Sequence, residues 1–249
     1  MRVLLTAVKC DKGDPVVNLG RHVRLLEVGQ LAGCHLVVFP EMSLSGSVDP
    51  EQHPERALAL DHPIVDLLVD ATHGRPAALF GIGEAAADGR FLITQLLASG
   101  GELRGVYRKR HLGEGEEAFA TGVQNAVLHL VGRPVGVAIC AESGVDEAFD
   151  DAAEAGASVS FLCSAPGLHG RRLDDAARAE GFAWWLEKGL GDALRHARRR
   201  RLWIAMSTQA GATVDEDFPG LAALVSPSGE VVARLPDWNE GELVVEVPD

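Results

Sequence analysis

The order of strand-like and helix-like segments at the start of the chain constrains the fold more than any other feature. Residues 2–9 are typical of a buried strand because residues 3–8 form an apolar run, and residues 35–39 form a second such run. Between them, residues 19–30 repeat apolar side chains at helical spacing. Two strands joined by a helix predict a parallel pair, which places the chain in the α/β class.

Two predicted hairpins exclude a purely parallel sheet. Residues 91–99 and 102–108 flank a Gly-Gly turn, and residues 127–131 and 135–139 flank a second short turn. The remaining predicted helices are residues 63–72, 144–155 and 182–197, and the remaining predicted strands are residues 77–82, 159–162, 203–207, 221–226, 231–235 and 243–247. No repeat or linker divides the sequence. We therefore expect one α/β domain over residues 1–249, with a mixed sheet or two stacked sheets.

Composition limits the classes of partner. The chain has 249 residues, 47% of them hydrophobic, so it can bury a large core and is not disordered. Its formal net charge of −13 opposes binding to nucleic acid and to anionic membranes. The first residues do not have the pattern of a signal peptide, and no uncharged apolar stretch is long enough to span a bilayer. These features predict a soluble, cytoplasmic protein for which nucleic acid is an unlikely partner.

Two smaller patterns have alternative interpretations. The arginines at 198–201 offer an RNA-binding patch, but they also complement the dipole at the end of a predicted helix. The segment Gly81-Ile-Gly83-Glu-Ala-Ala86 follows a strand, as in dinucleotide-binding oxidoreductases. That fingerprint requires a helix next, whereas Asp88-Gly89 and a further strand follow here. We interpret the match as a hairpin turn.

Three chemically reactive side chains directly follow predicted strands: Glu41, Lys109 and Cys140. Reactive groups gather beyond the carboxyl ends of strands in α/β sheets. Each residue also has an ordinary interpretation, as a solvated carboxylate, a surface cation and a buried thiol respectively. Together they supply a nucleophile, a cation and a proton acceptor for acyl transfer through a covalent intermediate. The set predicts an active site.

Cys140 is the preferred nucleophile among four cysteines, the others being Cys10, Cys34 and Cys163. They form no C-x-x-C pair and have no histidine at ligand spacing, so we expect free thiols rather than a zinc site or disulfides. A predicted helix begins soon after Cys140, and its amino end favours a thiolate. Cys163 also ends a strand and is the rival nucleophile, and His111 offers a Cys-His dyad.

Three segments around these residues resemble the carbon–nitrogen hydrolase (nitrilase) superfamily. They are residues 39–46 (FPEMSLSG), 107–112 (YRKRHL) and 136–142 (GVAICAE), and further similarity lies in residues 207–211, 217–220 and 226–229. The resemblance implies a four-layer α-β-β-α sandwich with two mixed sheets. It also implies a homodimer or higher homo-oligomer that acts on non-peptide C–N bonds without a metal or an organic cofactor.

The same resemblance implies roles for individual residues. Cys140 corresponds to the nucleophile, Glu41 to the general base and Lys109 to the cation that stabilises the tetrahedral intermediate. The backbone amide of Ala141 corresponds to an oxyanion donor. Many members have a second active-site glutamate a few residues after the lysine, and Glu116 is the best match. The neighbours Glu114 and Glu117 stay open as alternatives.

Departures from the family pattern bear on the substrate. Ala141 stands where many members have an aromatic residue, Thr208 stands where Asn is common, and Val145-Asp146 replaces the usual Pro-Glu. The sequence Cys140-Ala-Glu142 favours an amide or carbamoyl substrate over a nitrile. Arg171 and Arg172 are candidates to bind a substrate carboxylate, although a solvated arginine pair is the commoner case.

The predicted function is a small-molecule amidase that releases ammonia through a thioester on the cysteine. An N-carbamoyl amidohydrolase and a nitrilase are the alternatives with the same machinery. A non-catalytic member of the family that binds a metabolite is the alternative from another class of protein.

Overall fold

The computed structural model describes residues 1–168, 174–213 and 216–248, and Arg171 and Arg172 lie outside this part. Hydrogen bonds connect the described strands into one network with two halves: nine strands follow one another in a single order, and four further strands pair beside it. The first half contains β5 (Glu102–Arg108), β4 (Phe91–Ser99), β3 (Ala77–Ala85), β2 (Leu36–Val38), β1 (Arg2–Val8) and β13 (Gly241–Glu246). The second contains β6 (Val127–Leu130), β7 (Arg133–Ile139), β8 (Val159–Ser164), β9 (Trp203–Ala212), β10 (Asp217–Pro219), β11 (Ala222–Val225) and β12 (Val231–Arg234).

Each half is a mixed sheet, as predicted. β1, β2 and β3 are parallel, as are β7, β8 and β9, while the two predicted hairpins, β4 with β5 and β6 with β7, are antiparallel. The halves meet along a short parallel ladder in which Ala7 faces Thr208 and Val8 faces Gln209. The two expected sheets are therefore joined at one edge, between β1 and β9.

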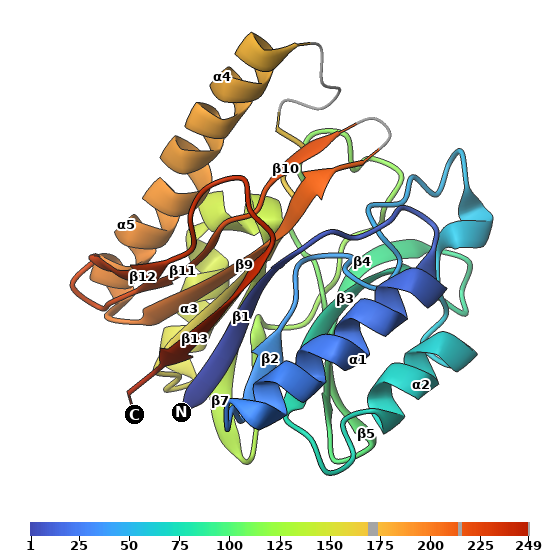
Figure 1. Ribbon diagram of the computed structural model, residues 1–249, viewed down its shortest axis with the longest axis horizontal. Coiled ribbons are helices and arrows are strands. Elements are labelled where there is room, and N and C mark those ends of the chain that lie inside the picture. Colours follow the sequence, from blue (N-terminus) through green and yellow to red (C-terminus); the bar gives the residue numbers. More distant parts are fainter. Residues whose placement is uncertain (169–173, 214–215, 249) are drawn as a thin grey trace.

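Helices cover the outer faces of the two halves (Figure 1). α1 (Pro15–Leu31) and α2 (Pro63–Asp70) lie on the first half, and α3 (Asp146–Glu154) and α5 (Gly191–Arg200) lie on the second. The alternation of side chains along β1 explains the layering. Leu4 packs in the core beneath α1 and α2, whereas Val3 and Leu5 point the other way into the core shared with the second half. This arrangement is the predicted four-layer sandwich.

The long helix predicted from residue 182 begins earlier and contains an irregular turn. α4 (Asp175–Trp185) continues through a π-helical turn (Leu186–Leu190) into α5. Asp174 caps its start by accepting a hydrogen bond from the Ala177 N–H, at 2.8 Å. Gly189 leaves room for the Trp185 ring, since a Cβ atom there would lie 2.4 Å from it. None of the described helices is both long and apolar enough to cross a bilayer.

Gly81 and Gly83 lie inside strand β3, so their interpretation as a hairpin turn was wrong. A Cβ atom on Gly81 would lie 2.3 Å from the backbone nitrogen of Met42, and one on Gly83 would lie 2.6 Å from the Val48 side chain. The two glycines therefore allow the segment after β2 to pack closely on β3. The turn of this hairpin comes later, where the Ala86 N–H donates to the carbonyl of Arg90.

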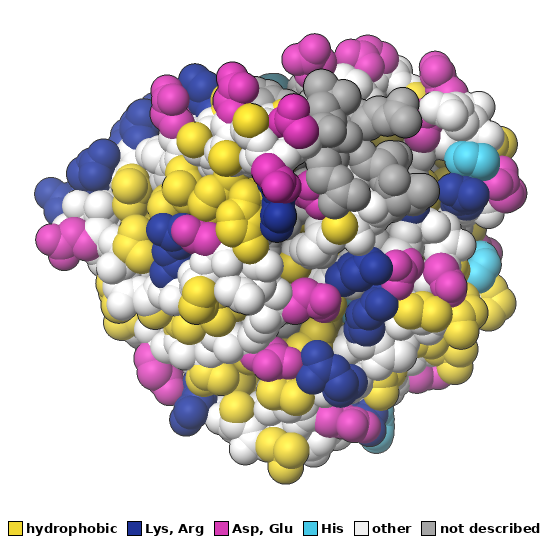
Figure 2. Space-filling model, turned by 45° about the horizontal axis from the view of Figure 1, so that its top comes forward, with side chains coloured by type: hydrophobic (Ala, Val, Ile, Leu, Met, Phe, Trp, Pro, Cys, Tyr) yellow, Lys and Arg dark blue, Asp and Glu magenta, His cyan; other side chains and the backbone are white. Residues whose placement is uncertain are grey.

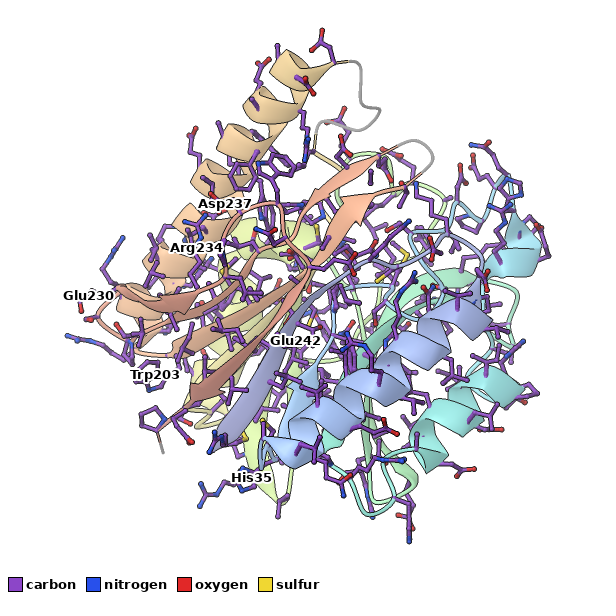
Figure 3. All side chains as sticks on the ribbon, viewed as in Figure 1. His35, Trp203, Glu230, Arg234, Asp237 and Glu242 are labelled. Carbon is purple, nitrogen blue, oxygen red and sulfur yellow. The ribbon has the colours of Figure 1, made fainter. Side chains whose placement is uncertain are left out.

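The surface of the molecule mixes charges of both signs. Figure 2 shows basic and acidic side chains interspersed with apolar ones over one face. On β13, Glu242 accepts a hydrogen bond from Arg24 of α1 at 2.9 Å, and Arg234 pairs with Asp237 in the connection that follows β12 (Figure 3). Among the arginines at 198–201, Arg199 and Arg200 are paired with Asp150. These pairings favour the structural interpretation of the arginine run over an RNA-binding patch.

Candidate active site

Glu41 lies in the segment that follows β2, and this segment continues to form hydrogen bonds with β3. The Leu44 N–H donates to the carbonyl of Gly81 at 2.9 Å, and the Ser43 hydroxyl accepts from the Gly81 N–H at 3.1 Å. Two residues on, the Ser45 hydroxyl accepts from the Gly83 N–H at 2.9 Å. The hydroxyls of Ser43 and Ser45 thus hold the segment that contains Glu41 against β3.

Two buried glutamines fix the backbone around Glu41. The Gln209 amide, on β9, donates to the backbone carbonyl of Glu41 at 2.9 Å, and the Gln95 amide, on β4, donates to the carbonyl of Phe39 at 3.1 Å. Both side chains are fully buried. Sequence analysis gave neither glutamine a role, and the only signal available was the inclusion of Gln209 in a segment of family similarity.

Lys109 lies between two carboxylates. Its ammonium donates to Oε1 of Glu41 at 2.7 Å and to Oε1 of Glu116 at 2.6 Å, and the lysine side chain is fully buried. The other oxygen of Glu116 accepts from the Gly113 N–H at 2.6 Å. Glu116 is thus the glutamate that reaches Lys109, whereas Glu117 accepts from the Gly115 N–H.

Cys140 occupies a sharp turn at the end of β7. Its φ of 45° is in the left-handed region that side chains other than glycine seldom adopt. A 3₁₀ turn, Cys140–Gly144, follows immediately. Of the four cysteines, Cys140 is the residue that is partly exposed, and the other three are buried.

The backbone amide of Ala165 connects Glu41 with the thiol. It donates to Oε2 of Glu41 at 2.9 Å, and its hydrogen bond to Cys140 lowers the pKa of that thiol. Ala165 directly follows β8, whose Cys163 is opposite Ile139 in the parallel ladder with β7. The ends of β2, β5, β7 and β8 therefore meet at one place, as the sequence predicted for Glu41, Lys109 and Cys140.

The pKa values of Glu41 and Lys109 are both raised in this cluster. Burial raises the pKa of Glu41, and Glu116 adds to this effect while Lys109 opposes it. Burial disfavours the charged form of Lys109, but Glu41, Cys140 and Glu116 outweigh burial and raise its pKa. Burial is the main reason for the upward shift at Glu41, and the negative charge of Glu116 adds to it because the two carboxylates share one ammonium. At Lys109 the neighbouring negative charges outweigh burial.

The expectation of a thiolate stabilised by a helix was wrong. Burial and the Glu41 carboxylate raise the pKa of Cys140 well above its usual value of 9.0, and the Lys109 ammonium offsets only part of this. α3 begins only at Asp146, after the 3₁₀ turn, so its amino end is not at the sulfur. Cys140 is therefore a neutral thiol at pH 7, and Glu41 is the adjacent group that can take its proton.

The other candidates lie elsewhere in the structure. Cys163 is fully buried within β8, and burial raises the pKa of its thiol. The His111 ring lies 2.8 Å from Glu147, with which it pairs instead of forming a dyad with Cys140. The Thr208 hydroxyl bridges the backbone N–H and carbonyl of Leu221, so Thr208 stabilises the sheet and does not line the site.

Ala141 and Glu142 follow the nucleophile candidate in the 3₁₀ turn. Ala141 is half-buried, and a Cβ atom on Gly113 would lie 3.1 Å from its methyl group, so the chain around Glu116 passes close by. Glu142 is fully buried and bonds to backbone groups next to both Lys109 and Cys140, a role that sequence analysis missed. In the part of the chain that the structure describes, no group of His, Cys, Asp or Glu side chains could hold a metal ion.

Known proteins resemble this chain in sequence and in fold. The carbon-nitrogen hydrolase family model matches residues 9–249, so the chain belongs to this family. An (R)-stereoselective amidase from a Pseudomonas species is 31% identical over 236 residues, which cover 93% of this chain and 80% of that protein. A glutamine-dependent NAD(+) synthetase from Xylella fastidiosa is 28% identical, and the match covers 99% of this chain but only 44% of that protein.

Solved structures show the same fold at lower identity. An amidase from Nesterenkonia sp. AN1, with acrylamide added at its active-site cysteine, has a TM-score of 0.82 at 22% identity, covering 100% of this chain and 93% of that chain. A variant of the same amidase in complex with butyramide has a TM-score of 0.78 at 21% identity, covering 100% of this chain and 91% of that chain. These structures belong to the nitrilase superfamily, whose sandwich fold the sequence predicted.

Proposed function

We propose that the protein is a small-molecule amidase in which Cys140 attacks the amide carbon and ammonia is released. The observation that carries the proposal is the arrangement of Lys109, which is buried between Glu41 and Glu116 at 2.7 and 2.6 Å. Its ammonium also acts on the thiol of Cys140: burial and Glu41 raise the pKa of that thiol, and the positive charge of Lys109 offsets part of the rise. A nucleophile, a proton acceptor and a fixed cation are the groups that acyl transfer requires.

The first half of the reaction forms the thioester. As the sulfur of Cys140 bonds to the amide carbon, its proton moves to Glu41, which is an ionised carboxylate at the start. The carbonyl oxygen becomes an oxyanion, stabilised by the Lys109 ammonium and the backbone N–H of Ala141. Glu41 then gives the proton to the amide nitrogen, the C–N bond breaks and ammonia departs.

The second half hydrolyses the thioester. Glu41 takes a proton from water, the hydroxide oxygen attacks the thioester carbon, and the same donors stabilise the new oxyanion. The C–S bond then breaks and the sulfur regains its proton from Glu41, while the carboxylic acid leaves. Glu116 keeps the ammonium charged and oriented throughout, because its carboxylate accepts a second hydrogen bond from Lys109 at 2.6 Å.

The relatives suggest which amides to try first. The Pseudomonas relative is named as an amidase, and the Nesterenkonia amidase has been seen with butyramide and with an acetamide moiety bound to its cysteine. We therefore propose short uncharged amides as substrates. The proposal also retains the predicted single domain over residues 1–249, the homodimer and the cytoplasmic location.

The test is ammonia release from a panel of butyramide, acrylamide, an N-carbamoyl amino acid and an aliphatic nitrile. We expect turnover of the amides and a loss of at least about a thousandfold in kcat/KM for Cys140→Ser, with unchanged thermal unfolding. Cys163→Ala is the matched control and retains activity. Full activity of Cys140→Ser contradicts the proposal, and a wild-type protein that releases no ammonia supports the non-catalytic alternative.

A further inference from the structure

Glu142 has more bonding partners than its place in the sequence suggests. Its side chain is fully buried, two residues after Cys140. Its two oxygens accept hydrogen bonds from one hydroxyl and three backbone amides. Oε1 accepts from the Tyr107 hydroxyl at 2.8 Å, the Arg110 N–H at 2.8 Å and the His111 N–H at 3.3 Å, and Oε2 accepts from the Ile139 N–H at 2.9 Å.

These donors lie on both sides of the active site. Arg110 and His111 directly follow Lys109, whereas Ile139 directly precedes Cys140. Lys109 follows β5, which pairs with β4, and Cys140 follows β7, which pairs with β6 and β8. The two strands thus belong to opposite halves of the sandwich, and no shared ladder sets their separation. The Glu142 carboxylate bonds directly to both.

From this we infer that Glu142 is a positioning residue that sets the separation between the Lys109 ammonium and the Cys140 sulfur. The oxyanion of the proposed reaction has to lie within reach of both groups at once. Misplacing a catalytic group by about 1 Å can lower the rate about a hundredfold. The inference uses the proposed function for one of its readouts, and its geometry is independent of that function.

A carboxylate suits this place better than an amide. An ionised carboxylate accepts hydrogen bonds at both of its oxygens, and Glu142 has three donors at Oε1 and one at Oε2. A glutamine has only one accepting oxygen. Its NH₂ group would therefore face a backbone N–H donor, either of Arg110 and His111 or of Ile139, with which it cannot form a hydrogen bond. Glu142→Gln therefore keeps the volume of the side chain while it breaks the bond to one of the two segments.

Glu41 keeps its own supports when Glu142 changes. The Ala165 N–H holds its side chain and Gln209 holds its backbone carbonyl. The charged groups that act on the Cys140 thiol are Glu41, Lys109 and Glu116. Loosening either segment therefore changes the separation between the ammonium and the thiol, and the attraction that lowers the pKa of Cys140 weakens as that separation grows.

The experiment compares Glu142→Gln with Tyr107→Phe, the matched control. Tyr107→Phe also removes a buried hydrogen bond to Glu142, but it leaves all three backbone bonds in place. Alkylation of Cys140 by iodoacetamide is followed by mass spectrometry as a function of pH, and amide turnover is measured in parallel. Thermal unfolding of both variants records the loss of stability that they share.

For Glu142→Gln we expect the pH midpoint of alkylation to rise by about 1 unit and kcat/KM for the amide to fall at least about tenfold. For Tyr107→Phe we expect an unchanged midpoint and turnover within about threefold of wild type. Glu142→Asp, which keeps the charge but is too short to reach both segments, replaces Glu142→Gln if that variant fails to fold.

An unchanged midpoint in the Glu142 variant overturns the inference, whatever happens to turnover. The same is true if Tyr107→Phe shifts the midpoint equally, because general loosening then explains both. A wild-type protein that turns over no amide, combined with a midpoint shift confined to the Glu142 variant, overturns the proposed function and supports the positioning role.

Discussion

Two clusters of ion pairs in this protein shift the pKa of a carboxyl group in opposite directions. In the active site, burial raises the pKa of Glu41 despite a lysine at 2.7 Å. On the outer face of α3 and α5, hydrogen bonds from Arg200 and Arg199 lower the pKa of Asp150 to about 2. The presence of an ion pair therefore does not by itself decide whether the pKa of a carboxyl group is raised or lowered.

The difference comes from water and from the balance of charge. Asp150 is partly exposed and has two arginines, so its charged form is favoured. Glu41 is buried and shares one ammonium with Glu116, so the site has a surplus of negative charge. The surface cluster, Asp150 with Arg199 and Arg200, keeps its carboxylate ionised. The buried cluster, Glu41 with Lys109 and Glu116, is suited to accept a proton and pass it on.

Removing the ammonium of Lys109 from the buried cluster has the largest expected effect on activity and stability. In Lys109→Met the two carboxylates of Glu41 and Glu116 lose their shared partner, and the oxyanion loses a donor. We expect kcat/KM to fall at least about a thousandfold and the protein to lose about 3–5 kcal/mol of stability. Steady-state kinetics and urea unfolding measure the two effects. Activity within tenfold of wild type would show that the ammonium is not needed.

The pH dependence of turnover tests the direction of the shift at Glu41. The base has to be ionised, so kcat/KM falls as pH is lowered through its pKa, by about tenfold per unit below the midpoint. Because burial raises the pKa of Glu41 above its usual value of 4.5, we expect the acid midpoint above 4.5. A midpoint below 4.5 would mean that Lys109 dominates over burial.

Of the three changes, a substitution at Asp150 in the surface cluster has the smallest expected effect on turnover and stability. We expect Asp150→Asn to leave turnover unchanged and to cost at most about 1 kcal/mol at pH 7, because the pairs are partly exposed. The pKa of Asp150 is lowered, so its stabilisation is present above about pH 4 and is lost as pH falls toward 2. Thermal unfolding at pH 7 and pH 2.5 measures this, and an equal loss at both would contradict it.

The side chains proposed for catalysis could be predicted from the sequence because each directly follows an apolar strand. Glu41, Lys109 and Cys140 lie together as expected. The second glutamate could only be narrowed to three neighbours, since a loop without periodicity does not show which side chain points inward. The structure selects Glu116 through its bond to Lys109.

The supporting groups could not be predicted, because their roles arise from tertiary contacts. The amide of Ala165 belongs to the backbone and has no side-chain signal. Gln209 and Glu142 resemble ordinary polar residues until strands from opposite halves are brought together. The apolar pattern of β1 and β9 likewise shows which faces are buried, but not that Ala7 and Val8 pair across the two halves.

The division of the site between two halves of the sandwich has a consequence for synthesis in the cell. Residues up to Glu116 supply both carboxylates and the ammonium, the thiol comes at residue 140, and the amide that fastens the base comes at Gln209. A growing chain therefore exposes its cysteine before the site that uses it is assembled. We therefore expect the thiol of a nascent or truncated chain to behave as an ordinary cysteine until β9 pairs with β1.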